Sequence, residues 1–265
     1  MQSNKNNNES QFIAKVRTAL GYAPDKRREW SALNLNDIDA QRSELLNRIR
    51  TRTSPEKQKL LTVLIAQSQP LNLKVIVLND AVSVTHDIIN IIQEKQPEWG
   101  RSKQVIAWKH PLIESLGLES ALQKRNINVP VYYADLDRNP QDKEFPDSDR
   151  EKIRHNISDS FIGLTSADYC LAETATLVMK TRTGQARAVS LVPAIHIAVI
   201  EKDSIIANLK ELYALIEHDN SMTEGQTNCM TFITGPSKTA DIEAVMVHGA
   251  HGPRELYLYV ITGGV

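Results

Sequence analysis

The sequence predicts an α/β fold with a mainly parallel central sheet. Short apolar runs rich in β-branched residues, such as Leu73–Leu78, alternate with longer segments whose apolar residues recur at helical spacing. Strands that alternate with helices form βαβ units, whose strands pair in parallel. The chain has 265 residues, of which 41% are hydrophobic, and this is enough for one sizeable core.

The N-terminal part is predicted to form a helical arm. Apolar residues at helical spacing indicate one helix over Gln11–Leu20 and a second over Asn36–Ile49. The Ser-Pro-Glu triplet at residues 54–56 is typical of a helix start, because serine caps, proline fits the first turn and an acid favours the positive end of the helix dipole. We therefore expect an arm over residues 1–68 and an α/β domain over residues 69–265.

The remaining elements follow the alternation in order. Strands are expected at Leu73–Leu78, Val105–Trp108, Val129–Tyr133, Phe161–Thr165, the segment that ends at Met179, Ile195–Ile200, Met230–Thr234 and Glu255–Ile261. Helices are expected at Ala81–Gln93, in segments between Pro111 and Lys124, at Ser204–Ile216 and at Thr239–Val247. Polar stretches predict loops at Asp135–Asp149 and His218–Asn228.

Composition and charge narrow the classes of partner. A formal net charge of −1 gives no general attraction to nucleic acid or to an anionic membrane surface. No apolar run approaches the roughly 18 residues of a membrane span. The two cysteines, Cys170 and Cys229, lie far apart and outside any CxxC motif, which favours a reducing compartment and predicts a cytoplasmic protein. A zinc or iron–sulfur site usually needs about four ligands, so we expect this chain alone to bind no such cofactor.

The segment from Thr234 to Glu243 is the strongest local candidate for a ligand site. It reads as a strand that ends shortly before a helix begins, and free backbone N–H groups at a helix start attract anions. Ser237 and Thr239 add hydroxyl donors and Lys238 adds a positive charge, which together suit phosphate or carboxylate. The alternative is an ordinary helix cap. The segment is not a Walker motif, and the chain has no GxGxxG fingerprint.

A second candidate is the glycine-rich turn just before the last predicted strand. Gly249, Gly252 and the following proline force an irregular backbone there. His251, held in such a turn, is a candidate oxyanion donor or acid/base group near neutral pH. His248 and His251 lie three residues apart, but no third metal ligand is in view, so we expect no metal. The alternative is a connector with exposed histidines.

Two further stretches carry polar groups among small or apolar residues. Asp168 and Glu173 lie in one of them, and a carboxylate in such surroundings has a raised pKa unless it is paired. The alternative is that Glu173 and Thr174 form a hydrogen-bonded turn between two strands. His196 lies inside a predicted strand, where a core histidine satisfied by a neighbour is the favoured interpretation and a ligand contact is the alternative.

Four stretches taken together resemble one family. ADYCLAETATLV (167–178), SLVPAIHIAV (190–199), TGPSKTADIE (234–243) and HGPREL (251–256) resemble, in this order and spacing, the LUD domain of the lactate utilization protein C (LutC/YkgG) group. The resemblance implies a Rossmann-like sheet similar to the NagB/RpiA/CoA-transferase group. It also implies participation in the oxidation of L-lactate to pyruvate with iron–sulfur partner proteins, which would carry the clusters that this chain lacks ligands for.

We predict that the candidate residues of these stretches share one site. We expect Glu173 and His251 as catalytic candidates. We expect these residues to bind a small anionic ligand: Thr174, His196, Gly235, Pro236, Ser237, Lys238, Thr239, Asp241 and Gly252. The chain departs from the family's usual pattern at three positions, where Ala175 replaces glycine, Lys238 replaces arginine and Ala250 replaces valine. Alanine at a position that needs a positive φ is strained, and lysine keeps the charge but not bidentate recognition.

Three functions remain open at this point. The first is a component of a lactate-oxidising assembly that binds a small anion or stabilises its partners. The second is a stand-alone enzyme of the CoA-transferase or sugar-phosphate isomerase class, in which Glu173 is the nucleophile, and this rests on fold analogy. The third is a small-molecule sensor.

Overall fold

The structure is a computed structural model of the whole chain that describes residues 14–21, 35–97, 103–135, 147–218, 229–240, 246–248 and 252–263. The chain divides into two units, residues 1–47 and 48–265. In the first unit residues 14–19 are helical, and α2 (Leu35–Arg50) begins there, so both predicted N-terminal helices are confirmed where they are described. The predicted domain boundary at residue 68 stays a prediction.

A six-stranded sheet forms the centre of the second unit, and all of its described pairings are parallel. The strands, in their order across the sheet, are β1 (Leu73–Leu78), β12 (Glu255–Ile261), β7 (Ile195–Glu201), β4 (Ile162–Ser166), β2 (Val105–Ala107) and β3 (Val131–Tyr133). This confirms the predicted α/β class. The last described strand therefore lies between the first described strand and β7, next to the edge of the sheet.

A four-stranded second sheet packs beside the first. Its order is β8 (Ile205–Ile206), β5 (Tyr169–Leu171), β6 (Thr176–Lys180) and β9 (Met230–Ile233). β5 and β6 are antiparallel and are joined by the one-turn η2 (Ala172–Thr174). Ala175, which follows η2, has a φ of 46° and is fully buried. The position therefore does require the left-handed conformation, and alanine occupies it at a conformational cost.

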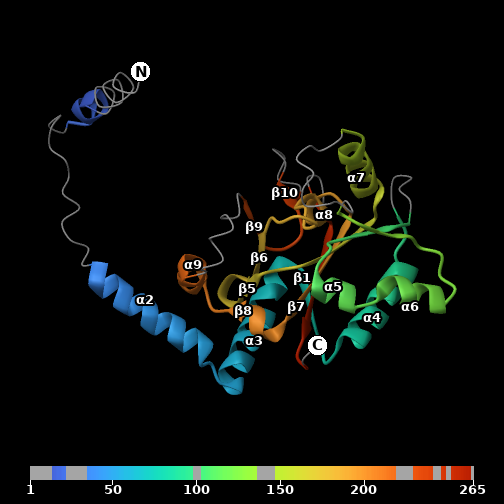
Figure 1. Ribbon diagram of the computed structural model, residues 1–265, viewed down its shortest axis with the longest axis horizontal. Helices are drawn as coiled ribbons and strands as arrows, with labels where there is room; N and C mark the ends of the chain where they lie inside the picture. Colours follow the sequence, from blue (N-terminus) through green and yellow to red (C-terminus); the bar gives the residue numbers. More distant parts are fainter. Residues whose placement is uncertain are drawn as a thin grey trace, which may run out of the picture. The chain divides into compact units, whose positions relative to one another are not determined.

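Both faces of the central sheet are covered, which explains why its strands are almost continuously apolar. Leu256, Leu258 and Val260 of β12 face one core, which the second sheet and α3 complete. Tyr257, Tyr259 and Ile261 face the other core, against helices on the opposite side. Those helices are α4 (Ala81–Glu94), α5 (Pro111–Ser115) and α6 (Leu118–Lys124). Figure 1 shows α4, α5 and α6 on one side of β1 and β7, and α3 with β5 and β8 on the other.

α3 (Ser54–Ser68) begins at the predicted Ser-Pro-Glu triplet, but its N-cap is Thr53 and not Ser54. The Glu56 carboxylate accepts hydrogen bonds from the backbone N–H and the hydroxyl of Thr53, each at 2.8 Å. The helix buries Leu61 and Leu64 against the central sheet. η1 (Gln69–Leu71) follows and leads directly into β1.

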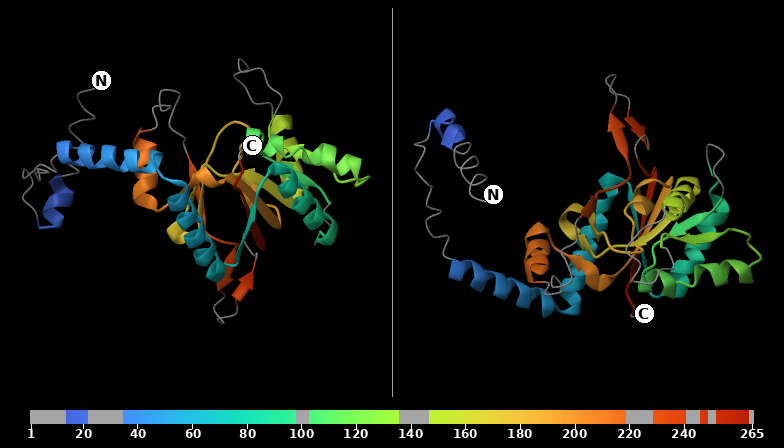
Figure 2. Two further views of the ribbon diagram at one scale, coloured as in Figure 1. Left: turned by 90° about the horizontal axis from the view of Figure 1, so that it is seen from below. Right: turned by 45° about the horizontal axis from the view of Figure 1, so that its top comes forward.

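Two predicted helices are different in the structure. The segment Thr239–Val247 is not a helix over its described residues, because β10 (Lys238–Ala240) and β11 (Met246–His248) pair as an antiparallel two-stranded sheet. Cross-strand pairing supplies the backbone hydrogen bonds that helix-forming residues would otherwise supply locally. Figure 2 shows these two strands, in red, projecting beyond the body of the sheets.

The segment Ser204–Ile216 is helical only in its second part. The chain first forms η3 (Lys202–Ser204) and then β8, whose two isoleucines pair with β5. α9 (Leu209–His218) follows, and the Asn208 side chain accepts a hydrogen bond from the Lys210 N–H at 3.1 Å. Because β8 pairs with β5, the helix begins later than predicted, directly after Asn208, whose side chain caps it.

Two helices were not predicted. α7 (Asp147–Asp159) begins inside the stretch Asp135–Asp149 that was expected to be a loop, of which residues 136–146 lie outside the description. Ile153 and Ile157, one turn apart, pack against the core, and this i, i+4 spacing was the available signal. The second is the short helix α8 (Ala188–Leu191), just before β7. No helix among the described residues has the length and apolar character of a membrane span.

Gly163 makes the contact between β4 and α8 possible. A Cβ atom at this position would lie 1.9 Å from the Val189 carbonyl oxygen and 3.1 Å from Pro193 Cγ. We therefore expect Gly163→Ala to lower the free energy of unfolding by about 3 kcal/mol, because α8 must move off the sheet. Urea denaturation measures the change. Lys124→Ala, at an exposed helix end, is the control and should stay within about 0.5 kcal/mol. An unchanged midpoint for Gly163→Ala would contradict this packing.

Candidate functional site

A pocket of about 190 Å³ opens at the amino ends of β7 and β12. Its apolar walls are Leu191, Phe232, Ile233, Pro236, Pro253 and Leu256. Its polar side chains are Ser190, His196, Thr234 and Ser237, and Gly235 and Gly252 complete the lining. Ligands in open α/β sheets usually bind at the carboxyl ends of the strands, so this pocket lies at the opposite end.

The loop after β9 forms one wall, and its shape depends on Gly235. This residue has a φ of 85°, in the left-handed region. A Cβ atom there would also lie 2.9 Å from the carbonyl oxygen of Leu71. Pro236 is buried next to it, and the Ser237 N–H donates to the Pro253 carbonyl at 2.8 Å. The loop after β9 is thereby fixed to the turn that precedes β12.

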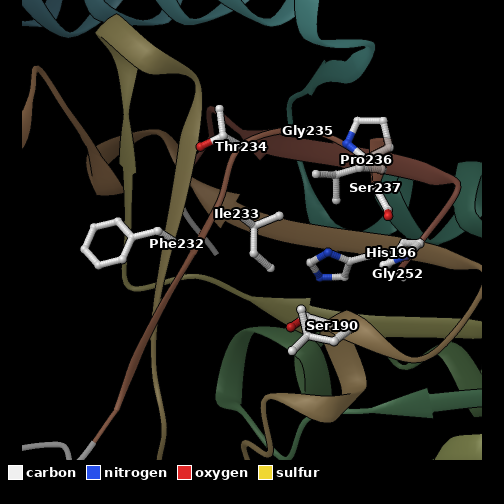
Figure 3. A pocket seen from close by; sticks show the side chains of 12 residues that line it. Ser190, His196, Phe232, Ile233, Thr234, Gly235, Pro236, Ser237 and Gly252 are labelled. Carbon is white, nitrogen blue, oxygen red and sulfur yellow. The ribbon is translucent and has the colours of Figure 1, made fainter. Parts of the chain in front are cut away.

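His196 forms the buried polar part of the pocket. It lies in β7, opposite Gly163 on one neighbouring strand and Leu256 on the other, and its side chain is fully buried. Its Nε2 is 2.8 Å from the Thr165 hydroxyl, whereas its Nδ1 has no hydrogen-bond partner. Burial lowers the pKa of His196 to about 3, so the imidazole is neutral at pH 7. In Figure 3 the ring lies between Ile233 and Ser190, with Ser237 close by.

A chain of hydroxyl groups connects the η2 turn to the pocket. The Thr174 and Thr176 hydroxyl oxygens are 2.8 Å apart, and those of Thr176 and Thr234 are 2.7 Å apart. Only Thr234 of these three lines the pocket. Thr174 therefore lies two hydroxyls away from the site and supports it indirectly.

The structure brings some of the predicted site residues together and separates others. The predicted ligand-binding residues that line the pocket are His196, Gly235, Pro236, Ser237 and Gly252. Lys238 begins β10, where its side chain is exposed, and Thr239 pairs with Val247 in the same two-stranded sheet. Asp241 and His251 lie outside the described residues.

Glu173 forms the turn that was the alternative to a catalytic role. Its side chain is exposed, and its carboxylate accepts a hydrogen bond from Asn208 Nδ2 at 2.9 Å. Its backbone N–H donates to the Ala207 carbonyl at 3.1 Å. These contacts join η2 to the residues before α9, and Glu173 is not among the residues that line the pocket.

The helix start that was expected to attract an anion is a strand. Because β10 replaces the helix after Ser237, no row of free backbone N–H groups and no helix dipole is available at Lys238–Ala240. Among the described residues that line the pocket there is no lysine or arginine. The contribution that a helix start would make to anion attraction is therefore absent at Lys238–Ala240, and the anionic ligand stays a prediction from the sequence.

Asp168 belongs to a charged cluster at the other end of the sheet. Its carboxylate pairs with Arg182 at 2.6 Å and accepts from the Lys180 N–H at 2.7 Å. Lys109 pairs with Asp135 at 3.1 Å nearby, and the pKa of His110 is lowered by its burial. These charges compensate one another. Within the described parts of the chain, no three His, Cys, Asp or Glu side chains gather as a metal site.

Sequence reasoning missed the residues that complete the pocket. Ser190, whose hydroxyl donates to the Arg187 carbonyl at 2.8 Å, begins the stretch SLVPAIHIAV, but it was not predicted as a site residue. Leu191, Phe232 and Ile233 looked like ordinary strand or helix residues. Thr165, the partner of His196, carried no local signal, because its role depends on a neighbouring strand that comes about 30 residues later.

Comparison with known proteins is consistent with this fold. The chain matches the LUD domain family over residues 61–261. A crystal structure of a DUF162 family protein from Deinococcus radiodurans superimposes with a TM-score of 0.50 and 21% identity, over 77% of this chain and 98% of that one. At this identity the likeness concerns the fold alone. It supports the α/β class, while the NagB/RpiA-like label stays a prediction.

Several curated relatives carry the name lactate utilization protein C. The protein of Halalkalibacterium halodurans is 31% identical over 65% of this chain and 67% of its own length. That of Macrococcus caseolyticus is 31% identical over 77% of this chain and 78% of its own length. That of Bacillus subtilis is 32% identical over 56% of this chain, and the match spans 58% of the relative.

The neutral state of His196 gives the stability of the protein a pH dependence. The pKa of the folded state, about 3, lies below the value of 6.5 for a free histidine. Below pH 6.5 the unfolded chain therefore takes up a proton that the folded chain does not, and stability falls as the pH falls toward 3. His196→Gln should reduce this slope by one proton, or about 1.4 kcal/mol per pH unit, in urea denaturation between pH 4 and 6.

An exposed, uncharged residue of α6 provides the control for this experiment. Gln123→Ala should leave the slope unchanged, because it alters no group that binds a proton. Equal slopes for the wild type and His196→Gln would mean that His196 takes up its proton in the folded protein.

Gly235→Ala should destabilise the protein by about 1–2 kcal/mol or more, because alanine is strained at a φ of 85° and its Cβ meets Leu71. Thermal and urea unfolding measure the effect. Ser237→Ala, in the same loop, keeps the backbone and should change the free energy of unfolding by less than about 0.5 kcal/mol. If the two variants were equally stable, the left-handed conformation would not be what shapes this loop.

Proposed function

The chain belongs to the LUD domain family, and from this premise we propose that it is a component of L-lactate utilization. In this proposal it takes part in the oxidation of L-lactate to pyruvate together with iron–sulfur partner proteins, and the pocket around His196 is its ligand site. The observation that carries the proposal is the set of relatives named lactate utilization protein C, at about 30% identity over more than half of the chain.

The chemistry of the cysteines supports placing the clusters on partner proteins. Oxidation of lactate releases two electrons, and iron–sulfur clusters that carry electrons are held mainly by cysteine thiolates. Cys170 is fully buried, and burial raises its pKa to about 12, so it stays a thiol. Cys229 is the only other cysteine of the sequence. Two cysteines, one of them buried and protonated, do not fit a cluster, which supports placing the iron–sulfur clusters on other chains. A cytoplasmic location belongs to the same proposal.

The pocket supports a ligand-handling role for this chain in the assembly. It combines apolar walls with a few convergent polar groups, which is the usual composition of small-molecule sites. Its buried imidazole nitrogen has no partner, and such a group is expensive to leave unsatisfied. A direct binding measurement decides whether the ligand is the small anion that the sequence predicts.

The stand-alone enzyme with Glu173 as nucleophile gains no specific support from the structure. The Glu173 carboxylate is exposed and hydrogen-bonded to Asn208, and it does not line the pocket. An acyl-enzyme adduct on Glu173, detected by mass spectrometry after incubation with acetyl-CoA, would establish this second function and displace the first.

Deleting the gene should abolish growth on L-lactate as the only carbon source while leaving growth on pyruvate unchanged, because the block lies before pyruvate. The wild-type gene should restore growth, and a tagged copy should co-purify with cysteine-rich iron–sulfur proteins. As a control, Glu173→Gln should restore growth as well as the wild type does. Normal growth of the deletion strain on lactate would overturn the proposal.

A further inference from the structure

We propose that the pocket at the amino ends of β7 and β12 binds an uncharged molecule through a carbonyl-type acceptor, which receives a hydrogen bond from Nδ1 of His196. The inference deepens the proposed function. It takes from that function only the premise that the pocket is a ligand site. It differs from the expectation of an anionic ligand, and three properties of the described pocket lead to it.

The first property is the direction of the hydrogen bond between Thr165 and His196. Their contact of 2.8 Å allows two arrangements. If His196 Nε2 carries the hydrogen, both the Thr165 hydroxyl hydrogen and the bare Nδ1 are left unpaired in the core. If the Thr165 hydroxyl donates to Nε2, only Nδ1–H is unpaired. A buried donor without a partner costs about 1–3 kcal/mol, so the second arrangement is favoured.

The second property follows from this tautomer. His196 is fully buried, and among the buried side-chain nitrogen and oxygen atoms of the described residues its Nδ1 lacks a hydrogen-bond partner. Because Nδ1 carries a hydrogen, a ligand must bring an acceptor to satisfy it. A carbonyl oxygen meets this requirement, and its binding recovers the free energy that the unpaired donor costs in the empty protein.

The third property is the absence of positive charge among the described lining residues, whose polar side chains are three hydroxyls and the imidazole. The imidazole itself is neutral, because burial lowers its pKa. A carboxylate that entered would lose hydration without gaining an ion pair, and this penalty is large in an apolar site. A neutral carbonyl compound loses much less, while Ile233, Pro236 and Leu256 supply apolar contacts for its body.

The pocket is also accessible from solvent. Leu191 and Phe232, at its rim, are 37% and 43% exposed. A ligand can therefore enter without unfolding of either sheet, and in Figure 3 Ile233 lies between the Phe232 and His196 side chains. A buried, unpaired donor beneath an open, mainly apolar mouth is the geometry of a site that recognises one polar atom on an apolar molecule.

Benzamide and benzoate form a matched pair of probes, because they have nearly the same size and shape and differ in charge. Ligand-observed NMR on the full-length protein should show that benzamide binds, with benzoate at least about 10-fold weaker. In protein labelled with ¹⁵N-histidine, the Nδ1 resonance of His196 should report a protonated nitrogen and should shift with benzamide. Benzoate binding as tightly as benzamide, no binding of either probe, or an unprotonated Nδ1 would each overturn the inference.

Two variants assign the binding to this pocket. His196→Phe keeps a ring but removes the donor, and should weaken benzamide by about 10-fold. Leu191→Trp fills the exposed rim without changing the core, and should also weaken benzamide, so the test survives if His196→Phe fails to fold. Benzoate binding that is lost in Lys238→Ala would instead support the anionic ligand. These measurements use purified protein and are independent of the growth test. If benzamide binds but the deletion strain grows normally on lactate, the proposed function is rejected and this inference is not.

Discussion

The insertion of β12 between β1 and β7 is the constraint on which the rest of the structure depends. β12 pairs over its whole length with β7 and over Leu256–Ile261 with β1, and Leu256 lies opposite Leu73 on one side and His196 on the other. β12 thereby joins β1 to the rest of the central sheet and contributes to both cores. It also brings the turn at Gly252 and Pro253 to the residues before β7, without which the pocket would have no second wall.

This arrangement places the pocket at the amino ends of the parallel strands. The usual carboxyl-end position is occupied by paired charges, such as Asp168 with Arg182 and Lys109 with Asp135. At the amino end the second sheet contributes β9 and the loop after it, which cover the edge of the central sheet. In a simple doubly wound fold the amino ends of the strands are exposed to solvent. Here a second sheet packs on the first and forms a pocket at these ends.

The pocket differs in chemistry from the anion site that the sequence motifs predicted, because His196 lines it and Lys238 does not. Motifs with lysine, hydroxyls and a helix start suggest an anion, but β10 carries Lys238 out of the lining. What remains is a neutral imidazole, three hydroxyls and apolar walls. In a low-dielectric setting such a set distinguishes ligands mainly by hydrogen-bond direction and by the cost of burying charge.

The sequence by itself determined the α/β class and most of the elements, because period-2 and period-3.6 apolar patterns record local geometry. β1 and β12 begin and end at the predicted residues, and Ala175 proved to occupy a left-handed position that the family pattern had marked for glycine. These properties depend on residues that are near one another in the chain.

Only the tertiary structure decided which motifs meet and what they offer a ligand. Pairing between strands turned the expected helix after Ser237 into β10, which removed its anion-attracting end. The partner of His196 is Thr165 on another strand, and Glu173 faces Asn208 and not the pocket. Strand order and burial set these contacts, and both arise from packing between segments far apart in the chain, which no local pattern encodes.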